Sequence, residues 1–151
     1  MTTRTIAGEA AMNSGSFEGA LERRGLGSKT LWTGRILSGL AIAFLAMDAG
    51  MKLAQLQMVR EGASALGYPP ETMLPIGVVL LACTLLYAIP RTAVLGAVLL
   101  TGYLGGAIAT HVRVSDPLLT HTLFPIYVAA LIWGGLYLRD ARVRGFISSN
   151  Q

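Results

Sequence analysis

Three long stretches of the chain carry no Asp, Glu, Lys or Arg. They cover residues 72–89, 92–110 and 122–138. A helix rises about 1.5 Å per residue, so about 20 residues cross a hydrocarbon core of about 30 Å. The first two stretches have that length, and the third lies at its lower end. The pattern therefore predicts helices that cross a membrane.

A fourth candidate span precedes these stretches and contains charge. Only the twelve residues 36–47 separate Arg35 from Asp48. About twenty residues are needed to cross, so a span that starts at Arg35 places Asp48 and Lys52 in the outer part of the membrane. A soluble bundle is the alternative, but its helices each carry a polar stripe. Residues 72–89 and 92–110 have none, so we expect lipid around the helices.

The pattern predicts an all-α fold, a transmembrane four-helix bundle formed by residues 31–145. We expect helix one to continue to about Met58, before a turn-rich connector in which Pro69 and Pro70 forbid a continuous helix. The predicted spans are at about 33–53, 72–89, 92–112 and 122–138.

Residues 1–30 differ from the rest because they are rich in Gly, Ser, Thr and Ala. We expect a flexible cytoplasmic arm here, in which Gly25 and Gly27 stop any short helix.

Composition and charge agree with a membrane protein. The chain is 53% hydrophobic and 13% charged, against about 25% charged in soluble domains. Basic residues near span ends face the cytoplasm, and their distribution of eight against three places both termini there. No aromatic residues alternate with the basic ones, so nucleic acid is not expected as a partner. The cytoplasmic set is Arg23, Arg24, Lys29, Arg35, Arg91, Arg139, Arg142 and Arg144, and the outer set is Lys52, Arg60 and Arg113.

Small residues recur at a spacing of four on two of the predicted helices. Gly102 and Gly106 form a GxxxG pair, and Gly50 lies between Ala46 and Ala54. This spacing lets membrane helices approach closely. We expect Gly50, Gly102 and Gly106 to pack helices within the bundle, with a dimer contact as the alternative.

Polar residues collect at the predicted outer end of the bundle. Asp48 and Lys52 are one helical turn apart in the favourable order for an ion pair. The pair either pins helix one against its neighbours or belongs to a ligand or proton site. Tyr103 either lines such a pocket or fills the core. The whole candidate cluster is Asp48, Lys52, Tyr68, Tyr103, His111, Arg113, Asp116 and His121.

His111 and His121 flank the second outer loop. They either form hydrogen bonds to Asp48 or Tyr68 at the membrane interface or take part in a polar pocket. With Asp116 they match no tight metal-site spacing, so no metal is predicted. The single cysteine, Cys83, can form no intrachain disulfide and is expected to fill space in the core.

Known catalytic motifs are absent from the sequence. It has no phosphate-binding glycine-rich loop, no Ser/His/Asp arrangement and no HExxH. Ordinary hydrolase and nucleotide-dependent activities are therefore excluded. We assign no catalytic residue, and whether the protein is an enzyme stays open at this point.

The run IPRTAVLGAVLLTGYLGGAIATHVR, with AMDAGMKL in helix one, closely resembles the DoxX-like family of small bacterial membrane proteins. The resemblance covers about residues 33–145. It implies a four-helix transmembrane bundle in the bacterial cytoplasmic membrane. The family name comes from a subunit of a thiosulfate:quinone oxidoreductase, and related members are associated with thiol-linked or oxidative-stress complexes.

The resemblance favours a non-catalytic, accessory membrane component of a quinone-linked or sulfur-linked redox system. Its outer polar cluster would bind a small molecule such as a quinone, or a redox partner protein. One alternative is a small solute or proton carrier, which requires a homo-oligomer because four short helices can hardly enclose a water-filled path. The other alternative is a purely structural membrane scaffold.

Overall fold

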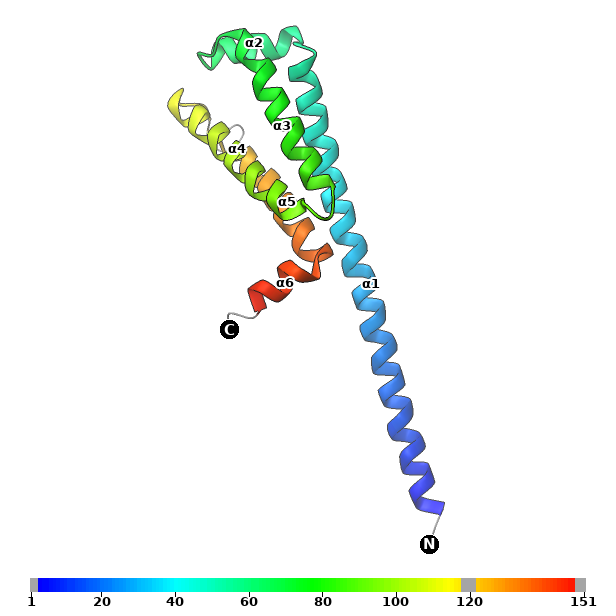
Figure 1. The fold of residues 1–151 in the computed structure, drawn as a ribbon. Coiled ribbons are helices and arrows are strands. Elements are labelled where there is room, and N and C mark those ends of the chain that lie inside the picture. The colour runs from blue at the N-terminus through cyan, green and yellow to red at the C-terminus, as the bar shows by residue number, and fades with distance from the viewer. Residues whose placement is uncertain (1–2, 118–121, 149–151) are drawn as a thin grey trace.

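A computed structural model gives the backbone of residues 3–117 and 122–148 and the side chains of 27–117, 122–140 and 142–145. The described residues form helices and connecting turns, with no strand among them, which confirms the all-α prediction. The elements in Figure 1 are α1 (Thr3–Leu53), α2 (Gln57–Ala65), the 3-10 turn η1 (Pro70–Thr72), α3 (Met73–Ala88), α4 (Ala93–Arg113), α5 (Phe124–Arg139) and α6 (Ala141–Ser148).

Four apolar helices pack side by side. α1 packs along α3 and α5, and α4 packs against the same two helices, so α1 and α4 lie diagonally opposite. α1, α3 and α4 belong to segments that are long and apolar enough to cross a membrane, whereas α5 is a shorter apolar helix. The structure therefore supports three to four spans. The exact number of spans and the side on which the termini lie stay predictions.

The helix α1 is longer than expected at its N-terminus. Its backbone is helical from Thr3 and continues through Gly25 and Gly27, which the sequence predicted would stop a helix. Glycine keeps its backbone N–H and so disfavours a helix by only about 1 kcal/mol relative to alanine. Two glycines therefore need not end a helix. The proposed cytoplasmic location of this arm stays a prediction.

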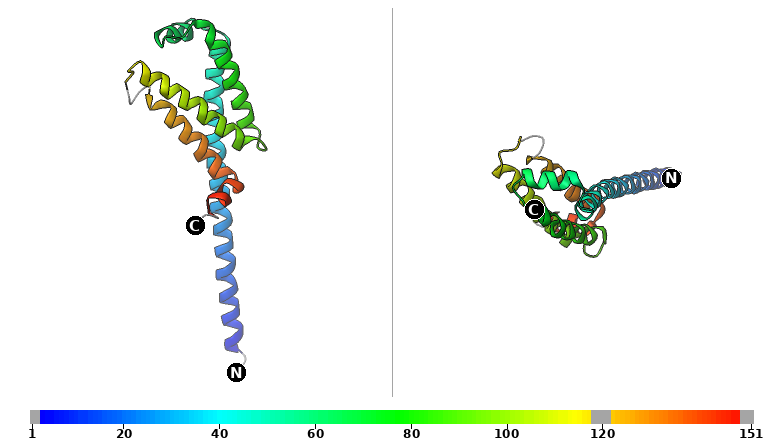
Figure 2. Two further views of the ribbon diagram at one scale, coloured as in Figure 1. Left: turned by 60° about the vertical axis from the view of Figure 1, so that its left-hand side comes forward. Right: turned by 90° about the horizontal axis from the view of Figure 1, so that it is seen from above.

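At its other end α1 stops at Leu53, before the expected boundary near Met58. Gln55 takes a left-handed backbone conformation with φ of 49°, and the chain then starts the separate helix α2. This short helix runs across the end of the others instead of continuing α1 (Figures 1 and 2). The turn brings Ala63 into a buried position, 2% exposed.

Glycines allow close helix contacts, but not the glycines expected from the GxxxG spacing. A Cβ at Gly77 would lie 2.8 Å from Lys52 Cβ, and one at Gly135 would lie 2.5 Å from Ser38 Oγ. At Gly50, Gly102 and Gly106 a Cβ would meet no described atom within 4 Å. Their expected role in packing within the bundle is therefore corrected. The buried face of α4 is formed by Gly96, Ala97, Leu100 and Leu104. It is a different face from the one that carries Gly102 and Gly106.

Specific hydrogen bonds join α1, α3 and α5 close to the turn from α3 into α4, at residues 89–92, which we call the link end. The fully buried Tyr87 donates its hydroxyl to the carbonyl of Ile132 at 2.8 Å and shares a 3.0 Å hydrogen bond with Ser38. Arg139 lies over the Tyr87 ring, 4.9 Å from its centroid, and donates to the Tyr87 carbonyl. From this end α3 and α4 diverge toward the opposite one (Figure 1).

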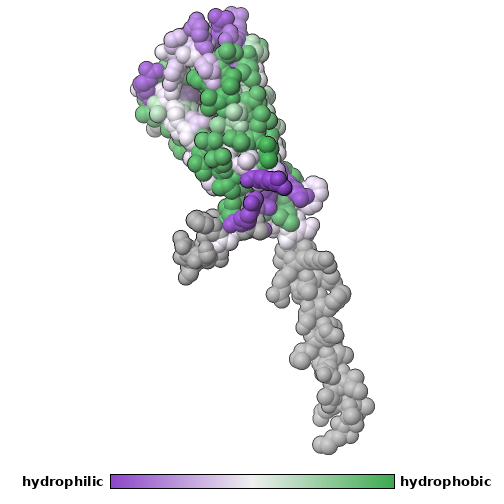
Figure 3. All heavy atoms as spheres, viewed as in Figure 1, coloured by the Kyte–Doolittle hydropathy of each residue, from purple (hydrophilic) through white to green (hydrophobic). Residues whose placement is uncertain are grey.

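An apolar surface lies between two polar ends (Figure 3). Leu40, Val79 and Val98 have exposed fractions of 57%, 53% and 53%. Many other large apolar side chains on the four helices are similarly exposed. Such a large apolar surface requires lipid or another apolar partner.

Candidate functional site

The ion pair on α1 forms as the sequence spacing predicted. Lys52 Nζ donates to Asp48 Oδ1, and their side chains are 16% and 27% exposed respectively. Gly77 of α3 lies directly against Lys52, which fixes the stem of the lysine near α3. Pairing lowers the cost of placing either charge in an apolar region. The two charges cancel at short range.

A cavity of about 510 Å³ lies beside this pair, between α1, α3, α4 and α5. It lies toward the end opposite the link end, where α1 and α4 end and α3 and α5 begin; we call this the pocket end. Its polar lining includes Asp48, Lys52, Tyr68, Tyr103 and His111. The sequence placed four of them at one end and Tyr103 as a residue that could line the same pocket, and the structure brings all five around one space. Their role in ligand binding stays a prediction.

All four helices that surround the cavity, α1, α3, α4 and α5, contribute to its apolar lining. Phe44 of α1 and Phe124 of α5 meet edge to face, with ring centroids 5.4 Å apart. Met73 and Ile76 of α3 face the same space. Sequence reasoning did not identify these residues, because an apolar residue in an apolar helix carries no signal of whether it faces lipid, core or cavity.

Of the polar residues of α4 that line the cavity, Tyr103 lies farthest from the end of the helix. It lies about three turns before the end of the helix and is half-buried at the cavity wall. Within the described part of the chain its hydroxyl has no hydrogen-bond partner, unlike that of Tyr68. A hydroxyl at an apolar wall normally has a partner. A ligand in the cavity would supply one.

A set of contacts joins the connector after α2 to the end of α4. The hydroxyls of Tyr68 and Thr110 share a 2.9 Å hydrogen bond. Arg113 Nη2 donates to the Leu66 carbonyl at 2.5 Å, and its guanidinium lies 5.8 Å from the centre of the Tyr68 ring. We call Leu66, Tyr68, Thr110 and Arg113 the latch.

His111 and Asp116 form a second polar pair at the pocket end. Nδ1 of His111 lies 2.6 Å from Oδ2 of Asp116. Ser115, with φ of 57°, turns the chain back so that the Asp116 N–H also bonds the His111 carbonyl. The expected partners of the histidines were Asp48 or Tyr68, whereas this bond goes to Asp116. His121 lies outside the described residues.

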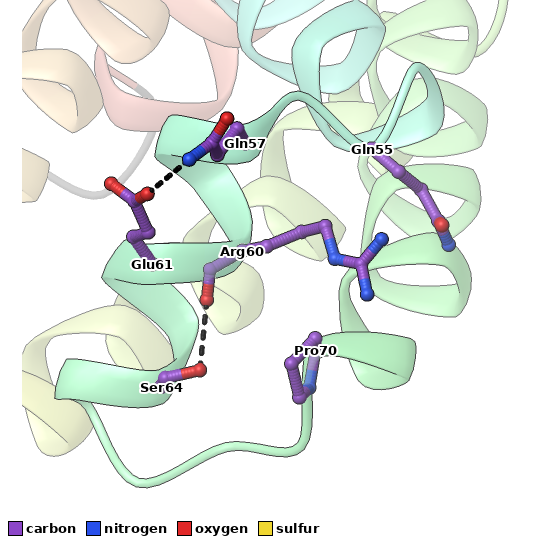
Figure 4. A pocket seen from close by; sticks show the side chains of 6 residues that line it. All are labelled: Gln55, Gln57, Arg60, Glu61, Ser64 and Pro70. Carbon is purple, nitrogen blue, oxygen red and sulfur yellow. Dashed lines mark hydrogen bonds between the residues drawn. The ribbon is translucent and has the colours of Figure 1, made fainter.

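A separate polar depression of about 600 Å³ lies on α2 and the turn before it. Its side chains bond locally, Gln57 to Glu61 at 2.8 Å and Ser64 to the Arg60 carbonyl at 3.0 Å (Figure 4). It has no wall of large apolar side chains and shares no residue with the cavity. Substitutions on α2 in this depression therefore leave the lining of the cavity unchanged.

Few of the described residues could bind a metal ion or react as a thiol. Among the residues that the structure describes, no group of three or more His, Cys, Asp or Glu side chains could hold a metal ion. Cys83 is a free, buried cysteine that does not line the cavity. The described lining of the cavity therefore contains no thiol.

Comparisons with known proteins identify one family. The model of the DoxX-like family matches residues 36–135, which includes the last third of α1, all of α2, α3 and α4, and most of α5. This confirms the resemblance seen in the sequence. A search of curated proteins and a search of solved structures each returned no match.

Proposed function

We propose that this chain, which belongs to the DoxX-like family, is an accessory component of a quinone-linked or sulfur-linked membrane redox system and binds a small molecule in its cavity. Family membership and the apolar helices make it a multi-pass integral membrane protein. We place it in the bacterial cytoplasmic membrane, with both termini in the cytoplasm.

The observation that carries the proposal is the mixed lining of the cavity. Small-molecule sites are typically apolar cavities of about 300 to 1,000 Å³ with a few polar groups that orient the ligand. This cavity has that size and combines Phe44, Met73 and Phe124 with the Asp48–Lys52 pair and Tyr103.

A quinone fits this lining chemically. Its ring is apolar, and its carbonyl oxygens accept hydrogen bonds, which the Tyr103 hydroxyl and the Lys52 ammonium can donate. Electrons would have to come from a partner protein, because the chain has a single cysteine and no described cluster of metal ligands. These features support an accessory role over a catalytic one.

The test is quinone binding by the purified protein in lipid nanodiscs. We expect a short-chain benzoquinone analogue to bind. Asp48→Asn breaks the ion pair that holds Lys52, and His111→Ala removes a polar group of the lining, so each should weaken binding by about tenfold, roughly the effect of one hydrogen bond. Glu61→Gln on α2 is the matched control, because Glu61 is exposed and does not line the cavity. Equal affinity in the parent and both cavity variants would remove the proposal.

A further inference from the structure

We propose that the cavity exchanges its ligand with the lipid phase, through the gap between α3 and α4, and that the latch closes the cavity toward water. The inference rests on the proposed small-molecule role and specifies the class of ligand: an uncharged molecule dissolved in the membrane.

The water-facing side of the cavity is covered by the connector after α2. Leu66 and Tyr68 of this connector line the cavity. They are held to α4 by the Tyr68–Thr110 hydrogen bond and by the Arg113 bond to the Leu66 carbonyl. Gly67, between them, has φ of 76°, a conformation that glycine adopts without strain. The latch therefore holds the connector against α4. The connector must separate from α4 before the cavity can open to water.

Across the side of the cavity between α3 and α4, the described residues form no contact comparable to the latch. The helices touch closely at the link end, where Gly96 lies against the backbone of Tyr87, and they diverge from there (Figure 1). Toward the pocket end the cavity is lined by Met73 and Ile76 of α3 and by Gly102 and Gly106 of α4.

Gly102 and Gly106 leave the α4 edge of this gap without side chains. Both residues are exposed, and a Cβ at either would meet no described atom within 4 Å. A residue that both lines the cavity and lies at the helix surface marks where the cavity meets its surroundings. The exposed side chains beside it on α3 and α4 include Leu74, Val78 and Val98, so the opening faces lipid.

The chemistry of the route and of the lining defines the ligand. A net charge is costly to move through hydrocarbon, so the route selects uncharged molecules. The Asp48–Lys52 pair adds no net charge to the cavity, and Tyr103 offers a donor without a described partner. The geometry fits an uncharged amphipathic molecule that carries a hydrogen-bond acceptor.

Thiol labelling tests the route directly. Ala107 lines the cavity, so Ala107→Cys in a Cys83→Ala background reports access to it. In proteoliposomes we expect fast labelling by a membrane-partitioning maleimide and slow labelling by a charged, impermeant methanethiosulfonate. Gly106→Leu should slow the maleimide by about tenfold, because the leucine side chain would occupy the space that Gly106 leaves open at the edge of the cavity.

Gly105→Leu is the matched control for the gap. Gly105 is exposed and also has no neighbour within 4 Å of a Cβ, but it does not line the cavity. We expect this variant to label like the parent. Equal maleimide rates in the Gly106→Leu and Gly105→Leu variants, with both proteins monodisperse, would overturn the lateral route.

Arg113→Gln tests the latch. Loss of the bond to the Leu66 carbonyl should raise the rate of the charged reagent by about tenfold, the factor expected for one charge-assisted hydrogen bond, and leave the maleimide rate unchanged. Charged-reagent labelling of the parent as fast as of this variant would overturn the closed end. Labelling needs no bound ligand, so these results are independent of whether a quinone binds.

Discussion

Tyr87 takes part in several of the hydrogen bonds that join helices at the link end. Its hydroxyl reaches α5 at the Ile132 carbonyl and α1 at Ser38, while its own backbone carbonyl accepts from Arg139. One residue of α3 thus bonds to two other helices, α1 and α5. We expect Tyr87→Phe to destabilise the fold by about 1 to 3 kcal/mol, because it leaves buried polar groups without their partner.

Unfolding by sodium dodecyl sulfate in mixed micelles measures this loss. Tyr137→Phe on α5 is the control, since Tyr137 is 42% exposed and its ring stays in the same environment. If Tyr87→Phe and Tyr137→Phe unfold at the same detergent fraction, the hydroxyl contributes nothing to stability.

The sequence predicted the arrangement of residues that differ in polarity from their neighbours. It did not predict the roles of residues that resemble their neighbours. Asp48 and Lys52 stand out in an apolar helix, and their spacing allows one main arrangement, which the structure shows. Phe44 and Met73 do not stand out from their neighbours. The role of the glycines was misassigned because spacing identifies a small-residue face without saying which way it points; Gly77 and Gly96, outside that motif, make the close contacts.

At the scale of elements, the start of α6 depends on Asp140. Its Oδ1 accepts from the backbone N–H of Arg142 at 2.9 Å, as an N-terminal cap does, and Oδ2 pairs with the Arg142 guanidinium at 3.2 Å. The Arg142 side chain first, and then this backbone bond, hold the pKa of Asp140 below its usual value. A lowered pKa means that the cap contributes above the ordinary carboxyl pKa and is lost as pH falls through the lowered value.

Hydrogen-exchange protection of α6 amides tests the cap. Asp140→Ala should lower the stability of α6 by about 1 kcal/mol at neutral pH. Asp140→Asn keeps a capping oxygen, so its protection should be largely retained and should not fall in acid as that of the parent does. Equal protection in the parent and the alanine variant at neutral pH would contradict the capping role.

The boundary between α1 and α2 shows what local pattern cannot predict. No proline or glycine lies at residues 54–56, and the apolar spacing of Leu53, Leu56 and Val59 favoured a continuing helix. The break is made instead by the left-handed conformation of Gln55, which local propensity disfavours. Burial of Ala63 against the other helices provides a tertiary gain that opposes this cost.

At the scale of the whole molecule, the length of α5 bears on whether this helix crosses the membrane. Its 16 residues extend about 24 Å, less than a typical hydrocarbon core of about 30 Å. α5 nevertheless packs along α1 and contacts α4, and it ends in Arg139 beside the link end. A short helix held between longer ones can span if the bilayer thins locally or flanking residues extend to the interface.

Cysteine accessibility in intact spheroplasts decides the number and direction of spans. In a Cys83→Ala background we expect an impermeant maleimide to label Glu61→Cys, at the pocket end, without permeabilisation. Arg91→Cys at the link end and Gly145→Cys in α6 should label only after permeabilisation, because basic residues gather on the cytoplasmic side. All three positions are exposed. Labelling of Arg91→Cys and Gly145→Cys from opposite sides would show that only one of α4 and α5 crosses, whereas Glu61→Cys and Arg91→Cys reacting from the same side would remove α3 as a span.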